Sequence, residues 1–312
     1  MGIILPNTCY FGKLIIDGSV AFLFVLLSLI FVIITGILSH MKTFIHDATA
    51  KKNKLSIHPK VAAFFDILIG GALLWYFGKA ANSWWVVAVW FIIRLVWWVG
   101  VMRIVYYAPV IRRLDHIRSL FTFQIGILAV MLFVDWSVNW YTWGTLFVVG
   151  SALSFWLLPT STSELSFIGK PHIRWCLILS VFGLAGVWSA AAAVVVFYSM
   201  WAWVAAWVVS MFWTLFISLI WWRYYNAPRE HITWSWIFLL GAALLPVSAV
   251  LLLWPIGFLI TGTLITWFWY ILWQLGRFYF SPDGINWKKQ ARFLVSNAML
   301  IVLAVTVLAR WR

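Results

Sequence analysis

Apolar residues are grouped in ten runs along the chain, and short polar segments separate them. A helix that crosses the hydrocarbon core of a bilayer needs about 20 mostly apolar residues. The pattern therefore predicts an all-α, polytopic membrane protein of about ten transmembrane helices, forming one domain over residues 1–312 without a soluble domain. The expected spans are Gly18–Leu38, Val61–Ala80, Trp84–Tyr107, Leu120–Asp135, Trp143–Leu158, Trp175–Phe197, Trp201–Trp222, Trp234–Leu253, Ile256–Gly276 and Phe293–Leu308.

Composition and charge agree with this interpretation. Hydrophobic residues make up 65% of the 312 residues and charged residues 10%, whereas soluble domains are about half apolar and a quarter charged. The net charge of +14 is concentrated in the loops after the first, third, fifth, seventh and ninth runs. Short cytoplasmic loops are rich in Lys and Arg, and anionic headgroups attract such loops. We therefore expect cytoplasmic basic loops and external termini, although Arg310 and Arg312 argue mildly against this placement of the C-terminus.

These features also define the expected surroundings of the protein. We expect membrane lipids, including anionic headgroups at the basic loops, as partners, and no nucleic acid. No eukaryotic targeting signal is visible in the sequence, so a bacterial inner (plasma) membrane is the expected location. The 26 tryptophans lie mostly at span ends, as aromatic belts at the membrane interface require.

Four histidines recur at nearly equal spacing and each lies near the start of an expected hairpin: His58, His116, His172 and His231. They divide the middle of the chain into four helical hairpins, at approximately 58–115, 116–171, 172–230 and 231–285, flanked by a first and a last helix. Parallel repeats of this kind occur in transporters. Duplication and convergence on the same interfacial chemistry both account for the pattern.

Two charged residues lie deep in neighbouring spans. Asp66 and Arg94 belong to one hairpin whose turn is near Asn82, and residue 66 should face the region of residue 98, about one helical turn from Arg94. Ionisable residues within a membrane are costly and usually functional. We therefore predict an ion pair inside the bundle. It either forms part of a gate or substrate path, or it neutralises two charges and determines helix register.

Other polar positions carry weaker expectations. Asp135 lies at the outer end of its span, either at a pore mouth or simply at the interface. The repeat histidines meet the depth condition for bis-histidine haem, but their basic, wet surroundings favour an interfacial role, so no cofactor or metal is expected. Gln124, Gln274 and Asn297 suit interhelical hydrogen bonds.

The sequence leaves three function classes open. The first is a transporter or channel for an apolar or lipid-like substrate. The second is a non-catalytic membrane subunit of a secretion, conjugation, respiratory or defence complex. The third is an interfacial lipid-modifying enzyme, which is disfavoured because the chain has eight carboxylates and lacks the hydrolase, metalloprotease and phosphate-loop motifs.

Overall fold

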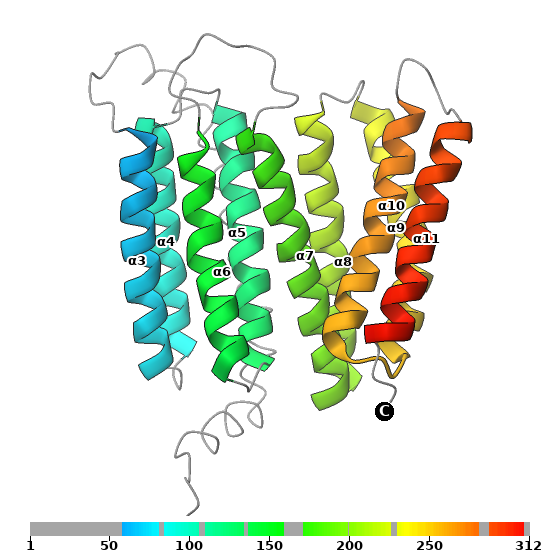
Figure 1. The fold of residues 1–312 in the computed structure, drawn as a ribbon, viewed down its shortest axis with the longest axis horizontal. Coiled ribbons are helices and arrows are strands. Elements are labelled where there is room, and N and C mark those ends of the chain that lie inside the picture. Colours follow the sequence, from blue (N-terminus) through cyan, green and yellow to red (C-terminus); the bar gives the residue numbers. More distant parts are fainter. Residues whose placement is uncertain are drawn as a thin grey trace, which may run out of the picture. The chain divides into compact units, whose positions relative to one another are not determined.

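The computed structural model describes residues 58–80, 84–105, 110–133, 137–158, 171–198, 200–225, 230–280 and 287–308. Within these ranges every regular element is an α-helix (Figure 1). The helices are α3 (Pro59–Ala80), α4 (Trp84–Val105), α5 (Val110–Phe133), α6 (Ser137–Trp156), α7 (Pro171–Phe197), α8 (Met200–Tyr224), α9 (Glu230–Leu253), α10 (Phe258–Tyr279) and α11 (Trp287–Leu308).

The helices coincide with the apolar runs of the sequence. Seven of the nine helices in the described ranges, all except α4 and α6, are long and apolar enough to cross a membrane. The protein is therefore a multi-pass, all-α membrane protein. The described part supports seven to nine spans rather than ten, and the first expected span, Gly18–Leu38, lies outside it.

Three helices begin well before the predicted position: α6 and α11 by six residues each, and α5 by ten. Helix α5 begins at Val110 and not at Leu120, so the basic segment with Arg112 and Arg113 is helical instead of forming a loop. Within this segment Arg118 Nη1 lies 3.0 Å from Asp115 Oδ1, one turn back along the helix. Such a pair at i,i+3 stabilises helical geometry in a polar stretch that the apolar pattern cannot identify.

The described helices divide into two compact units. Unit 1 is formed by the described residues up to 124 and from 137 to 179, and in it α3 packs mainly against α6 and also against α4. Unit 2 is formed by residues 125–133 and the described residues from 180 onward, and in it α8 contacts α9, α9 contacts α10, and α10 contacts α11.

Small residues allow close helix approach inside unit 2. A Cβ atom on Gly126 of α5 would overlap the backbone of Gly183, and one on Gly186 of α7 would overlap the backbone of Gly126. Likewise, a Cβ on Gly262 of α10 would overlap Ser189 of α7. Close backbone contact at small residues is a main source of helix association in membranes.

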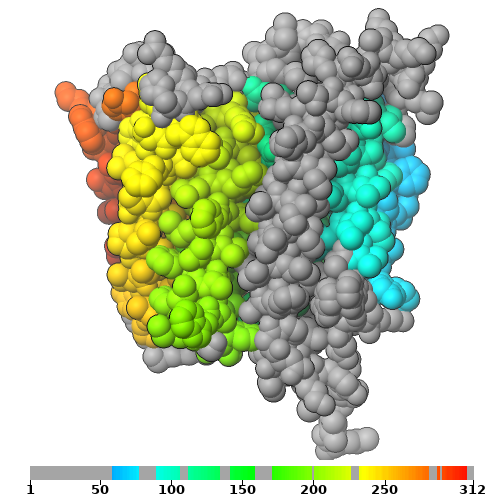
Figure 2. Space-filling view, turned by 180° about the vertical axis from the view of Figure 1, so that it is seen from behind, coloured from blue at the N-terminus to red at the C-terminus, as the bar shows by residue number. Residues whose placement is uncertain are grey.

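Large apolar side chains cover the outside of the helices. In unit 2 they include Phe238 and Leu239 of α9 and Phe212 of α8, two helices whose surfaces appear in green to yellow in Figure 2. Other tryptophans are internal, and Trp98, Trp188, Trp269 and Trp273 are fully buried. An apolar exterior around a core that contains the polar groups is the arrangement that a lipid environment requires.

Candidate functional site: a buried ion-pair network in unit 1

Asp66 and Arg94 form an ion pair between α3 and α4. Arg94 Nη1 lies 2.7 Å from Asp66 Oδ1, and Arg94 Nη2 lies 3.3 Å from Asp66 Oδ2. Neither side chain is exposed. The contact predicted from the hairpin is present in the structure. The guanidinium and the carboxylate meet in the two-pronged geometry in which arginine binds carboxylates most strongly.

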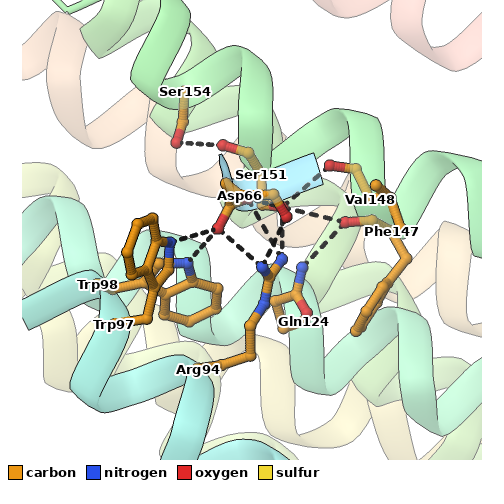
Figure 3. Close-up of polar contacts among 9 residues, drawn as sticks. All are labelled: Asp66, Arg94, Trp97, Trp98, Gln124, Phe147, Val148, Ser151 and Ser154. Atoms are coloured by element: carbon orange, nitrogen blue, oxygen red, sulfur yellow. Dashed lines mark hydrogen bonds and ion pairs between the residues drawn. The ribbon is translucent and has the colours of Figure 1, made fainter. Parts of the chain in front are cut away.

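The Asp66 carboxylate accepts further hydrogen bonds from the side of α4 (Figure 3). The indole Nε1 atoms of Trp97 and Trp98 each donate to Asp66 Oδ1 over 3.1 Å. Both tryptophans lie one helical turn beyond Arg94, where the antiparallel hairpin brings α4 opposite residue 66. The Trp98 ring also lies beneath the guanidinium, 5.2 Å from Arg94 Cζ to the ring centroid. One turn of α4 therefore supplies the main contacts of the carboxylate.

Helix α6 joins the pair through Ser151. Its Oγ lies 2.7 Å from Asp66 Oδ2 and accepts a hydrogen bond of 2.9 Å from Arg94 Nη2. The single hydroxyl proton has two backbone acceptors as alternatives, but the carboxylate is the nearest acceptor. Ser151 therefore bridges the acid and the base and connects α6 to the α3–α4 hairpin.

The surroundings of the pair are closely packed. A Cβ atom on Gly70, one turn after Asp66, would come within 3.1 Å of Arg94 Nη2. Gln124 of α5 donates from Nε2 to the Phe147 carbonyl of α6 over 3.0 Å, and Trp90 of α4 stacks on the Phe147 ring. The glycine leaves room for the guanidinium, and the neighbouring rings exclude solvent from it.

The charges balance within this network, but one donor has no acceptor there. Every carboxylate oxygen and both terminal guanidinium nitrogens have partners, whereas Arg94 Nε has none among the described residues. A neutral, well-bonded pair is the form in which two charges can persist in a low-dielectric interior. Breaking it would leave two buried charged groups without partners, at a high cost in free energy.

The sequence had suggested a wet interface for all four repeat histidines, but two of them lie elsewhere. His116 and His172 are buried, and His116 Nδ1 lies 3.3 Å from Cys176 Sγ. His116 is also well inside α5 and not at its start. His58 is exposed, and its Nδ1 accepts a hydrogen bond of 3.3 Å from the Lys60 backbone N–H at the start of α3. His231 lies on α9, and its side chain is outside the described part.

The remaining predicted positions either form hydrogen bonds between polar side chains or lie outside the described residues. Asp135 is not among the described residues. Gln274 of α10 donates to the Tyr270 hydroxyl of the same helix, and Asn297 of α11 accepts a 2.8 Å hydrogen bond from Trp267 Nε1 of α10. Across the described ranges, no group of three or more His, Cys, Asp or Glu side chains is placed to hold a metal ion.

Unit 2 contains an apolar groove at the end of the helices opposite their basic loops. Its walls come from the last turns of α9 and α11 and the first half of α10, and it encloses about 520 Å³. Val250 of α9, Leu264 of α10 and Val302 of α11 are among its wall residues. This volume falls in the range of small-molecule sites, so unit 2 has room for an apolar ligand.

Comparison with models of protein families, with curated proteins and with solved structures found no match.

Proposed function

We propose that the protein is an integral membrane transporter for an apolar or lipid-like substrate, with Asp66 and Arg94 at its gate. The observation that carries this proposal is the complete burial of an acid and a base between α3 and α4. Ionisable residues inside a membrane protein mark functional sites more often than structural ones, because their burial is so costly.

Stability alone does not account well for such a pair. Replacing a buried ion pair with well-packed apolar residues is often neutral or stabilising. The pair is better suited to a two-state element, since Ser151 of α6 contacts both charges. In the closed state the three helices are held together. In the other state, Asp66 and Arg94 exchange these contacts for new ones, and α6 moves away from the hairpin.

The substrate class follows from the surfaces available. The groove of unit 2 is lined almost entirely by hydrocarbon, and the network of unit 1 uses its charges on each other. Both features favour an apolar or lipid-like cargo over an inorganic ion. We place the basic loops in the cytoplasm and the protein in a bacterial plasma membrane, where anionic lipids contact those loops.

We further propose that all nine described helices cross the membrane, α4 and α6 included. The hairpins α3–α4, α5–α6, α7–α8 and α9–α10 are then four parallel repeats, and α11 is the last helix. Parallel repeats are one of the symmetries of secondary transporters. Because His116 and His172 are buried, the repeat we propose is one of helical hairpins and not one of interfacial histidines.

The test is a transport assay with purified protein. Proteoliposomes would contain trace NBD-labelled phosphatidylethanolamine, phosphatidylglycerol or fatty acid, and external dithionite would bleach the label that reaches the outer leaflet. We expect faster loss of inner-leaflet fluorescence with at least one probe than in empty liposomes. Rates equal to those of empty liposomes for all three probes would contradict the proposal.

Native mass spectrometry of the protein from its own host tests the alternative, a non-catalytic subunit of a membrane complex. A lone chain or small homo-oligomer agrees with a transporter. Stoichiometric partner proteins would favour the complex and overturn the transporter proposal.

A further inference from the structure

The apolar groove of unit 2 lies where α11 separates from α9 and α10. Near the basic end, α11 is attached to α10: Trp267 donates to Asn297, and Phe293 packs edge-on against Tyr270 and Phe278. The groove begins beyond these contacts, along residues 301–306 of α11. Only 6% of the Gln290–Val307 span is buried. Helix α11 is therefore fixed at one end and leaves a gap at the other.

Pro246 of α9 lies in the opposite wall of this gap. Proline has no N–H and cannot donate to the carbonyl four residues earlier, so α9 lacks one helical hydrogen bond at this level. Proline is tolerated in transmembrane helices where neighbouring groups compensate. Its ring adds a rigid, purely hydrocarbon surface to the wall.

The groove offers almost no hydrogen-bonding groups to a ligand. Apart from Trp254 and Thr306, every wall residue has a hydrocarbon side chain. The Thr306 hydroxyl already donates to the Val302 carbonyl of its own helix over 2.9 Å. A polar ligand would therefore lose its hydration in the groove without compensation, which disfavours its binding there.

The groove is continuous with the lipid-facing surface of the helices. Val250 and Val302 line it and are also 65% and 61% exposed. From Pro246 to Trp254 it extends about 12 Å along the helix axis at 1.5 Å per residue, close to half of a hydrocarbon core of about 30 Å. It therefore lies within one leaflet, and its open side faces acyl chains.

Trp254 marks the polar end of the groove. It follows the last residue of α9, lines the groove and is 41% exposed. Tryptophan at a helix end lies at the level of the headgroups, because its ring is apolar and its N–H is polar. An acyl chain in the groove would thus place the glycerol and headgroup of its lipid beside this indole.

We infer that the groove binds one acyl chain of a membrane phospholipid, in the leaflet opposite the basic loops. This inference requires that the helices lie in a membrane, but it does not require that the protein transports a substrate. If the proposed function is correct, this lipid is also a candidate cargo.

Photolabelling tests the site without a transport assay. The full-length protein would be reconstituted in vesicles of phosphatidylethanolamine and phosphatidylglycerol with a trace of phosphatidylglycerol bearing a diazirine in one acyl chain. Labelled peptides would then be mapped by mass spectrometry. We expect labels to concentrate at residues 246–254 and 301–306. In Val250→Phe/Val302→Phe, which fills the groove, labelling there should fall about tenfold, equivalent to about 1.4 kcal/mol of binding free energy.

Val295→Phe is the matched control. Val295 is exposed on α11 but lies outside the groove, so this enlargement should leave the labelling pattern unchanged. Uniform labelling along all exposed helices would show only general lipid contact and would overturn the inference. The inference would also be overturned if a second copy of the chain shielded residues 301–306 from labelling, which would be detected as cross-linked dimers. Failure of lipid transport with intact groove labelling would contradict the proposed function alone.

Discussion

Arg94 of α4 and Asp66 of α3 form a two-pronged, fully buried ion pair, and Ser151 of α6 contacts both partners. Three helices of unit 1 thus meet at one acid and one base. The energetics of this arrangement lead to predictions that separate the role of each contact.

Asp66→Asn should strongly destabilise the protein. The asparagine retains much of the shape but leaves the Arg94 charge buried without its counterion, and breaking a buried pair in this way costs about 3–5 kcal/mol. Thermal unfolding in detergent, followed by size-exclusion chromatography, would measure the loss. Arg94→Gln in the same chain should recover most of the stability. Equal stability of the wild type and the single variant would show that the charges contribute little.

Ser151→Ala should cost about 1–3 kcal/mol, because Asp66 Oδ2 and Arg94 Nη2 each lose a partner in a buried site. Ser154→Ala is the control on the same helix, since the Ser154 hydroxyl donates only to the Ser151 carbonyl. We expect a smaller effect there. A double-mutant cycle between Ser151→Ala and Asp66→Asn should show coupling, and additive effects would exclude Ser151 from the network.

Two adjacent glycines of α3 give a matched comparison. Alanine favours an exposed helix over glycine by about 1 kcal/mol, and a Cβ on Gly71 would contact nothing within 4 Å. Gly71→Ala should therefore be neutral or stabilising. A Cβ on Gly70 would crowd Arg94, so Gly70→Ala should lack this gain or destabilise. Thermal unfolding of both variants decides, and a larger gain at Gly70 would contradict the packing described around the guanidinium.

The helix crossing in unit 2 should not tolerate a side chain at Gly126. Its missing Cβ allows direct contact with the backbone of Gly183, and overpacking of this kind typically costs about 1–3 kcal/mol. We expect Gly126→Ala to lower thermal stability and the amount of monodisperse protein. Gly100→Ala, where a Cβ meets nothing within 4 Å, is the control, and similar behaviour of the two variants would argue against the close crossing.

Much of the fold could be predicted from the sequence, because a change from apolar to polar residues marks most helix ends. The start of α4 at Trp84 and the ends of α7 at Phe197 and α9 at Leu253 were located in this way. The start of α5 was the largest exception, and α6 and α11 also begin six residues earlier than predicted. The first turns of α5 carry charges that pair within the helix, and apolar pattern cannot distinguish such a segment from a basic loop.

The candidate site could be predicted only where its geometry is local. The turn of one hairpin determines which residues of α3 and α4 face each other, so the contact of Asp66 with Arg94 followed from spacing. Ser151 belongs to another hairpin, and a single serine in an apolar span gives no signal of its partner. The burial of His116 was missed because basic neighbours in sequence suggested water, whereas helix packing places the ring beside Cys176.

The most direct test of a gating role is lipid transport by Asp66→Asn/Arg94→Gln, measured in proteoliposomes and expressed per folded protein. This variant removes both charges together, so neither is left unpaired. We expect nearly normal stability and a fall in transport rate of about tenfold, the change that about 1.4 kcal/mol produces. A variant that is stable and transports at the wild-type rate would show that the pair is only structural and would contradict the account.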